Sequence, residues 1–343
     1  MALAQFWFLL IGFFFVGYFV LEGFDFGVGI LLPVLGRDDV DRRVMINTIG
    51  PVWDANETWV IVAGASMFAA FPEWYASMFS GFYLPLLAIL VALIIRGVAF
   101  EYRGKVDDAG WRRRWDACIF AGSVLPALLW GVAFANVVRG LPLDADGNYT
   151  GTVATLLNPY ALLGGLAFLA LFSCHGAIFV ALRTTGAIRH DARALGTRLG
   201  LVAIVVLGSF GAWTALARSD GAVALLAAIA VVALAGALVA NGGEREGVAF
   251  ALTAASVVAL LAMLAVALYP DVLPSTTDPA FSLTVASASS TPSTLRAMSW
   301  IALLALPFVI AYQAWTYWVF RGRIGRANIP AKLPHGAGTQ LRT

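Results

Sequence analysis

The sequence predicts an all-α polytopic membrane protein. Hydrophobic residues make up 60% of the 343 residues and charged residues 12%, and the mean hydropathy is +0.83. These values lie well outside the range of soluble globular chains. The net charge is only +2, and the basic residues form short clusters between apolar runs. Such clusters are typical of topology signals rather than of a nucleic-acid surface, so we expect no nucleic-acid partner.

Nine apolar segments are each long enough to cross a membrane as a helix, which takes about 20 residues. They cover residues 5–33, 50–71, 75–99, 116–139, 158–182, 199–218, 221–241, 248–269 and 297–320. The first segment follows no basic region and contains no small-residue cleavage site, so we expect a retained span rather than a signal peptide.

The Lys and Arg residues between these segments predict the orientation. Cytoplasmic loops carry an excess of positive charge. With the N-terminus outside and the C-terminus cytoplasmic, 18 of the 22 Lys and Arg fall in inner segments, three fall in outer ones, and Arg96 lies within a span.

We expect three regions along the chain. Residues 1–139 would form a first four-helix bundle and residues 140–270 a second, related by a weak repeat, while 271–343 would hold an outer loop, a ninth peripheral helix and a cytoplasmic tail. The Ser/Thr/Pro-rich loop 270–296 is expected either to cap the outer face or to be a flexible linker.

Charged residues gather toward the predicted cytoplasmic side of the first three spans. They are Glu22, Asp25, Asp54, Glu57, Arg96 and Glu101. Glu22 and Asp25 are three residues apart and so share one helix face, as do Asp54 and Glu57.

Two interpretations of these charges stay open at this stage. Asp54, Glu57 and Glu101 lie close enough to helix ends to be solvated, and Arg96 can reach toward water. Asp25 is flanked by apolar residues on both sides, so its carboxyl must be paired, neutralised or hydrated. Pairing of Arg96 with Asp25 or Asp54 would meet that need structurally, and the same cluster would also suit a proton entry path.

Other reactive residues point to no chemistry within this chain. Cys118 and Cys174 lack metal-site spacing and are expected in the core. Of the three histidines only His175 lies at membrane depth, whereas His190 and His335 lie outside the spans. We therefore expect no bis-histidine haem and no metal site here. This pattern favours a transporter or a subunit of a larger membrane complex.

Six contiguous motifs carry a resemblance to a known family. They are EGFDFGVG (22–29), RRVMINTIGPVWDANETWV (42–60), SGFYLPLLAILVALIIRGVAFEYR (80–103), WDACIFAGSVLPALLWGVAFAN (115–136), NPYALLGG (158–165) and YPDVLPSTTD (269–278). The chain resembles subunit II of the cytochrome bd-type quinol oxidases, over nearly its whole length and most strongly in residues 17–136.

The resemblance implies a terminal oxidase of the bacterial cytoplasmic membrane that oxidises quinol and reduces dioxygen to water. Haem b and haem d, or a b-type substitute, would lie in subunit I, the haem-bearing partner. Family positions matched by Asp25, Asp54, Arg96 and Glu101 imply a proton path from the cytoplasm, with Glu22 and Glu57 adjacent.

The resemblance also implies that Trp59 lies near an apolar oxygen path, and that a quinone or lipid is held at an unidentified site. Glu22 stands where some members of the family have Asp, which preserves the acid.

A proton-coupled secondary transporter and a purely structural anchor are the alternatives. The sequence leaves open the type of quinol, the type of oxygen-binding haem and a small single-helix accessory subunit.

Overall fold

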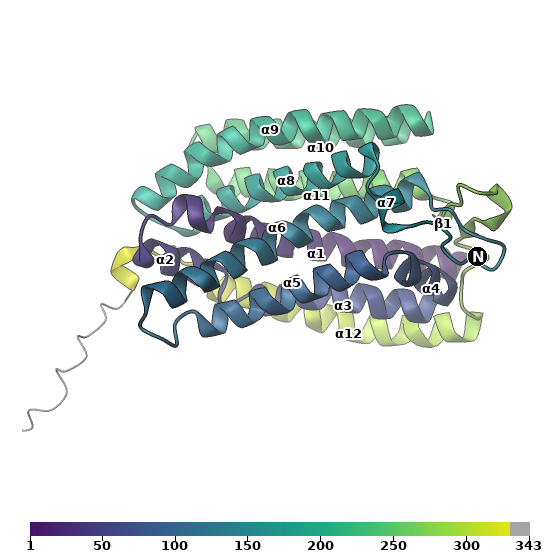
Figure 1. Cartoon of the computed structure of the whole chain (residues 1–343), viewed down its shortest axis with the longest axis horizontal. Helices are drawn as coiled ribbons and strands as arrows, with labels where there is room; N and C mark the ends of the chain where they lie inside the picture. Colours follow the sequence, from purple (N-terminus) through teal and green to yellow (C-terminus); the bar gives the residue numbers. More distant parts are fainter. Residues whose placement is uncertain (330–343) are drawn as a thin grey trace, which may run out of the picture.

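The computed structural model describes residues 1–329, which form an elongated bundle of α-helices (Figure 1). The helices are α1 (Ala2–Leu35), α2 (Asp39–Ile49), α3 (Trp53–Ala70), α4 (Pro72–Gly81), α5 (Tyr83–Tyr102), α6 (Ala109–Arg139), α7 (Val153–Leu156), α8 (Pro159–Arg183), α9 (Ala187–Arg218), α10 (Gly221–Gly242), α11 (Glu246–Leu268) and α12 (Pro292–Val319). Two short strands, β1 (Asp271–Leu273) and β2 (Leu283–Thr284), and the 3₁₀ turns η1 (Pro279–Phe281) and η2 (Arg326–Asn328) complete the described chain.

Eight helices of the described residues are long and apolar enough to cross a membrane. They are α1, α5, α6, α8, α9, α10, α11 and α12. Helix α3 is the segment predicted as the second span, and it is not one of the eight. Its 18 residues carry Asp54, Asn56 and Glu57 in the first two turns, which lowers the mean hydropathy.

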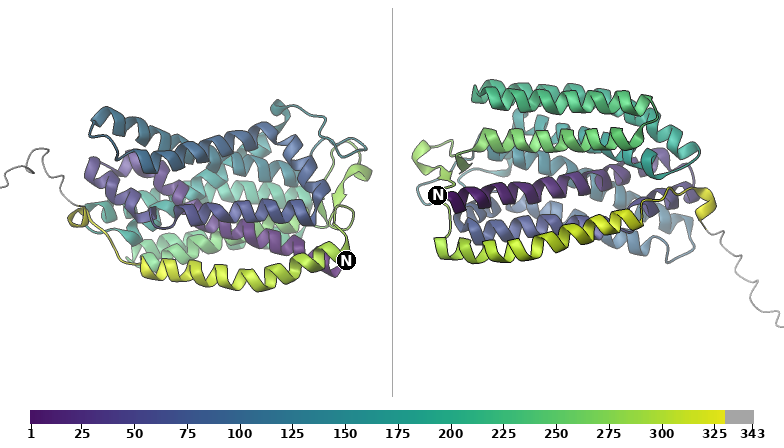
Figure 2. Two further views of the ribbon diagram at one scale, coloured as in Figure 1. Left: turned by 90° about the horizontal axis from the view of Figure 1, so that it is seen from below. Right: turned by 180° about the vertical axis from the view of Figure 1, so that it is seen from behind.

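Helix α1 lies in the middle of the bundle, with α9 and α10 along one edge and α12 along the opposite edge (Figures 1 and 2). It packs against α3, α6 and α8. Helix α12 is peripheral, because Leu295 and Gln313 are its only buried residues. This exposure agrees with the peripheral last helix expected from the sequence, while the arrangement of two four-helix bundles stays a prediction.

The central helices α1 and α8 cross at a pair of glycines. A Cβ atom on Gly27 would lie 2.2 Å from the carbonyl oxygen of Phe172, and one on Gly176 would lie 2.4 Å from the Cα of Gly27. Only glycine at both positions allows the two backbones to approach this closely.

The predicted third span, residues 75–99, was wrong at its start. The predicted span is divided between two helices: α4 ends at Gly81, Phe82 lies between them, and α5 begins at Tyr83. Pro85 lies in the first turn of α5, where the missing N–H of proline leaves no helical hydrogen bond unmade. The predicted inner loop before the second span also differs, because it contains the helix α2, which the Asp38 side chain caps.

The loop between α6 and α7, residues 140–152, pairs with the loop between α11 and α12, residues 269–291, at the end of the bundle that holds the N-terminus (Figure 1). The Leu141 N–H donates to the carbonyl of Pro274 (2.9 Å), and the Thr276 N–H donates to the carbonyl of Leu141 (2.9 Å). Strands β1 and β2 pair antiparallel within the second loop. The structure thus favours the capping interpretation of residues 270–296 over a flexible linker.

Candidate functional site

Arg96 is the centre of a buried ionic group that joins three helices. Its Nη2 donates to Glu22 Oε1 on α1 and, at 2.6 Å, to Glu57 Oε1 on α3. The side chains of Arg96 and Glu22 are 0% exposed, and that of Glu57 is 20% exposed. The guanidinium also lies over the ring of Phe26, 4.7 Å from its centroid. Glu22, Asp25, Glu57 and Arg96 are called the buried acid cluster below.

Asp25 belongs to this cluster because it lies on α1 one turn after Glu22, and it is also fully buried. Among residues 1–329 it has no ion-pair partner within 4.0 Å. Its Oδ2 accepts a hydrogen bond from Asn56 Nδ2 at 2.7 Å. Asn56 Oδ1 in turn accepts from Gln313 Nε2 (2.9 Å) and from the hydroxyl of Tyr317 (2.8 Å), both on α12.

The charges of the buried acid cluster do not balance. The cluster holds three carboxyl groups and one guanidinium, so full ionisation would leave excess negative charge where water is largely excluded. Several polar atoms of the cluster also have no hydrogen-bond partner among residues 1–329, namely Glu22 Oε2, Asp25 Oδ1, Arg96 Nε and Arg96 Nη1. Buried polar atoms normally find a partner. The cluster therefore has both the need and the hydrogen-bonding capacity for a bound proton or water.

The sequence prediction for Arg96 was wrong in its choice of partner. Arg96 pairs with Glu22 and Glu57 instead of Asp25 or Asp54. Asp54 and Glu101 are exposed. Four of the six predicted residues, Glu22, Asp25, Glu57 and Arg96, thus come together, and Asp54 and Glu101 lie at the surface of the same helices, α3 and α5.

Trp59 is buried on α3, one side of its ring facing α1. The ring packs edge-on against Phe13, with centroids 5.9 Å apart, and lies tilted against Phe14, with centroids 6.3 Å apart. Gly17 makes room for it, because a Cβ there would lie 2.6 Å from the indole. Phe13 also lines an apolar groove of about 330 Å³ between α1, α6 and α11. Trp59 itself is not one of the residues that line the groove.

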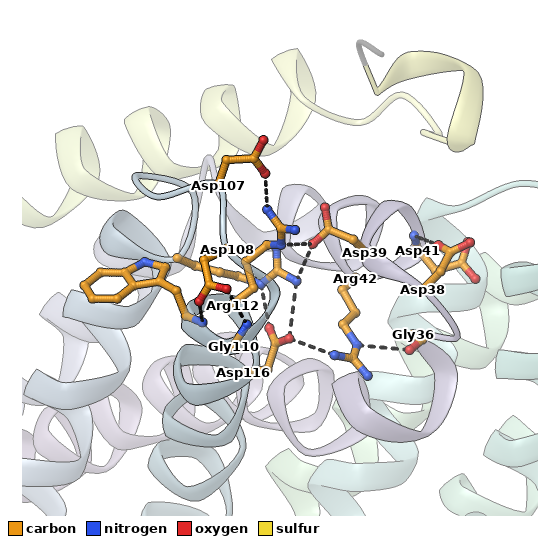
Figure 3. A network of polar contacts seen from close by, with 12 residues as sticks. Gly36, Asp38, Asp39, Asp41, Arg42, Asp107, Asp108, Gly110, Arg112 and Asp116 are labelled. Carbon is orange, nitrogen blue, oxygen red and sulfur yellow. Dashed lines mark hydrogen bonds and ion pairs between the residues drawn. The ribbon is translucent and has the colours of Figure 1, made fainter. Parts of the chain in front are cut away.

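A second ionic group lies at the end of the bundle that holds α2 (Figure 3). We call it the end network, and it consists of Asp39, Arg42, Arg103, Asp107, Arg112 and Asp116. Asp116 bridges two arginines, accepting from Arg103 Nε at 2.5 Å and from Arg42 Nη1 at 2.9 Å. Three arginines face three aspartates, so the end network is electrically balanced.

Two aspartates at the same end cap helices. Hydrogen bonds from the Arg326 side chain and from the Asp41 N–H hold the pKa of Asp38 below its usual value. Hydrogen bonds from the N–H groups of Trp111 and Gly110 likewise lower the pKa of Asp108. Both shifts stabilise the charged form of an exposed helix cap.

His175 is hydrogen-bonded through both ring nitrogens. Nδ1 lies 2.6 Å from Thr253 Oγ1 and Nε2 lies 3.1 Å from the carbonyl of Val20. The ring stacks on Phe250 with centroids 4.7 Å apart. Within residues 1–329, no group of three or more His, Cys, Asp or Glu is placed to hold a metal ion. His335 lies outside the described residues.

Comparisons with known proteins decide the family. The family model for cytochrome bd terminal oxidase subunit II matches residues 3–320. The chain belongs to this family. Cytochrome bd ubiquinol oxidase subunit 2 of Bacillus subtilis is 42% identical over 328 residues, which cover 94% of this chain and 97% of that protein. Cytochrome bd-I ubiquinol oxidase subunit 2 of Escherichia coli K12 is 34% identical, over 94% and 95% of the two chains.

A solved structure supports the fold of this bd oxidase subunit. A chain of the bd oxidase from Geobacillus thermodenitrificans superposes with a TM-score of 0.75 at 16% sequence identity, covering 93% of this chain and 99% of that one. The resemblance inferred from the motifs is confirmed. The chain is a multi-pass membrane subunit of a bd-type terminal oxidase, an oxidoreductase complex in which it acts beside subunit I.

Sequence reasoning missed Asn56, Gln313 and Tyr317 as partners of the bd oxidase subunit's buried acids. Asn56 falls within the motif WDANETW, between two residues that were singled out. Its place between two acids was the available signal. Nothing local distinguishes Gln313 or Tyr317, because their role depends on α12 packing against α3.

Proposed function

We propose that this chain is the non-haem subunit II of a quinol-oxidising bd complex in the bacterial cytoplasmic membrane. It stabilises the haem-bearing subunit I and supplies a route for protons from the cytoplasm. The unbalanced charge of the buried acid cluster is the observation that carries the proton role. A group of three buried carboxyls beside one arginine favours binding of a proton inside the protein.

In this proposal α3 also crosses the membrane and, together with the eight helices named above, gives the chain nine spans. Its 18 residues extend for about 27 Å at 1.5 Å per residue, close to the thickness of the hydrocarbon core. The N-terminus lies outside and the C-terminus in the cytoplasm, as the Lys and Arg distribution favours. Residues 1–139 and 140–270 form the two four-helix bundles, and 271–343 contain the outer loop, the peripheral helix and the tail.

The proposed proton path follows increasing burial. Asp54 and Glu101 are exposed on α3 and α5. Glu57 is 20% exposed and contacts Arg96, which is fully buried and contacts Glu22. Asp25 lies one turn further along α1. Protons would enter at Asp54 and Glu101 and reach Asp25 through the groups around Arg96.

The haems supply the redox chemistry of the complex, and this chain would hold none of them. Haem b and haem d, or a second b-type haem, belong in this proposal to subunit I, since both nitrogens of His175 are used by hydrogen bonds. Quinol oxidation releases protons outside, and reduction of dioxygen consumes protons from inside. The residues of this chain hold and pass those inner protons.

Subunit I would cover the face formed by α5 and α12. Helix α12 exposes large apolar side chains along most of its length, listed as follows: Trp300, Ile301, Leu303, Leu304, Phe308, Tyr312, Trp315 and Trp318. Helix α5 adds several more. Such a surface suits a subunit interface within the membrane. It lies beside Asn56, Glu57 and Arg96, so protons would have a short way to the partner.

Trp59 marks the apolar side of the same region. Dioxygen is apolar and enters apolar spaces readily, and Phe13 connects the Trp59 ring to the apolar groove on α1. We include this contact in the proposal as an oxygen path, with Trp59 as its inner boundary.

Substitutions of the acids test the proton role. Asp25→Asn and Asp54→Asn are expected to slow quinol oxidase turnover about tenfold, which corresponds to about 1.4 kcal/mol in the barrier. Haem spectra should stay intact, because the haems of the proposed complex lie in subunit I and not in this chain. Full turnover in both variants would mean that the carboxyls are structural.

Deletion of the chain tests the stabilising role. Membranes that contain subunit I alone should lose haem content and quinol oxidase turnover together, and full retention of both would contradict the proposal.

Family membership favours the oxidase over a proton-coupled transporter, which would move its substrate without a partner.

A further inference from the structure

A hydrogen-bonded amide connects the peripheral helix α12 to the buried acid Asp25. Asn56 is fully buried on α3 between them. Its Nδ2 donates to Asp25 Oδ2 at 2.7 Å, and its Oδ1 accepts from Gln313 and Tyr317 at 2.9 and 2.8 Å. Within the described residues, the polar contacts of the Asn56 side chain thus lead to α1 on one side and to α12 on the other.

The two donors on α12 fix the orientation of the Asn56 amide. A carboxamide oxygen can accept two hydrogen bonds, and a carboxamide nitrogen can only donate. Because Gln313 and Tyr317 occupy Oδ1 of Asn56, the NH₂ group must face Asp25. Turning the amide over would place its oxygen against Asp25 Oδ2, and Gln313 and Tyr317 would both have to change from donors to acceptors.

This orientation makes the two oxygens of Asp25 different. Oδ2 accepts from Asn56, whereas Oδ1 is equally buried and has no hydrogen-bond partner among residues 1–329. An oxygen that already accepts an N–H is the poorer site for a proton, so a proton binds to Oδ1 and leaves from it. The step forms and breaks one O–H bond and involves no electron transfer.

We propose that Asn56 is a positioning residue that assigns the exchangeable proton to Oδ1 of Asp25, and that Gln313 and Tyr317 of α12 hold it in place. This inference rests on the proposed proton role of Asp25. It also gives the peripheral helix a function: the position of α12 decides whether Asp25 is set for proton transfer.

Infrared difference spectra of the intact oxidase complex test the proposal, together with turnover. The carboxyl band of protonated Asp25 is identified by its absence in Asp25→Asn. In Asn56→Leu this band should move to higher wavenumber, because the carbonyl oxygen Oδ2 loses its donor. Turnover should fall about tenfold, as expected when a hydrogen bond to a charged group is lost.

Two milder variants keep the test valid if Asn56→Leu fails to assemble. Gln313→Leu and Tyr317→Phe each leave Asn56 with one donor, so each should give a smaller shift of the same band. Asn136→Leu is the matched control. Asn136 is also a buried asparagine, but it donates to the carbonyls of Val132 and Leu156. Its removal should leave the Asp25 band in place.

The outcomes separate this inference from the proposed function. If Asp25→Asn keeps full turnover, the proton path itself is wrong. If Asp25→Asn slows turnover but the assembled Asn56, Gln313 and Tyr317 variants keep the wild-type band and rate, only the role of Asn56 is overturned. A band shift in the three α12-linked variants and none in Asn136→Leu establishes the proposal.

Discussion

The buried acid cluster and the end network both combine arginine with acidic side chains, but they differ in charge balance. In the end network three arginines face three aspartates, and Asp116 accepts from both Arg42 and Arg103. The buried acid cluster contains three carboxyls and one arginine, which pairs with two of them, Glu22 and Glu57. Balanced, hydrogen-bonded pairs have no need to bind a proton, whereas an uncompensated buried acid must. In the proposed account, the end network therefore has a structural role and the buried acid cluster takes part in proton transfer.

Replacement of Arg96 is expected to have the largest effect on stability. Arg96→Gln leaves Glu22 and Glu57 without a counter-charge, which should destabilise the subunit by about 3–5 kcal/mol. The yield and thermal stability of the purified complex measure it. Arg103→Gln is the matched control, because Asp116 then keeps Arg42 and the loss should be smaller. Equal losses in the two variants would contradict the distinction between the two groups.

Asp116→Asn is expected to have the next largest effect, and on stability alone. Arg42 and Arg103 would share a neutral amide in place of a carboxylate, at a cost of about 1–3 kcal/mol. Turnover per haem should equal that of the wild type, because the end network carries no protons in this account. Thermal unfolding and turnover of the same preparation check both parts, and slowed turnover would assign the end network a role in transfer.

Asp25→Asn should slow turnover and leave stability nearly unchanged, which is the opposite of the result expected for Asp116→Asn. The new amide can still accept the hydrogen bond from Asn56, and it removes one excess negative charge. We therefore expect a change in unfolding free energy of less than about 1 kcal/mol, although turnover falls. Thermal unfolding followed by haem absorbance measures the stability. A loss larger than that of Asp116→Asn would show that Asp25 is held mainly as a structural charge.

The smallest effect concerns the exposed ion pair between Asp38 and Arg326, joined at 2.8 Å. Because the pKa of Asp38 is lowered in the folded state, its stabilising contribution is complete above the unfolded value of about 3.9 and is lost as the pH falls through the lowered one. Asp38→Asn at neutral pH should cost under about 1 kcal/mol and speed hydrogen exchange in residues 320–329. Unchanged exchange there would mean that other contacts hold this segment.

Sequence patterns predicted the spans because apolar runs of about 20 residues are set by the membrane and need no tertiary information. These patterns failed at the places where tertiary contacts decide the end of a helix or the partner of a side chain. The break at Phe82 interrupts a continuous apolar run. Arg96 selects Glu22 and Glu57 over Asp25 and Asp54 through the relative rotation of α1, α3 and α5.

The candidate site was predictable by residue type but not by contact. Acidic residues on adjacent spans indicated a polar centre, because charged residues at membrane depth are rarely without a role. Asn56 stood within the motif that was examined, yet its partners Gln313 and Tyr317 lie more than 250 positions away along the chain. Such a contact follows only from the packing of α12 on α3.

Proton uptake by the oxidase in sealed vesicles tests the central claim most directly. After rapid reduction and exposure to dioxygen, the voltage phase due to proton uptake from the inner side can be timed in wild type, Asp25→Asn and Asp116→Asn. We predict that this phase slows about tenfold in Asp25→Asn and keeps its wild-type rate in Asp116→Asn. A wild-type rate in Asp25→Asn, or equal slowing in both variants, would contradict the account.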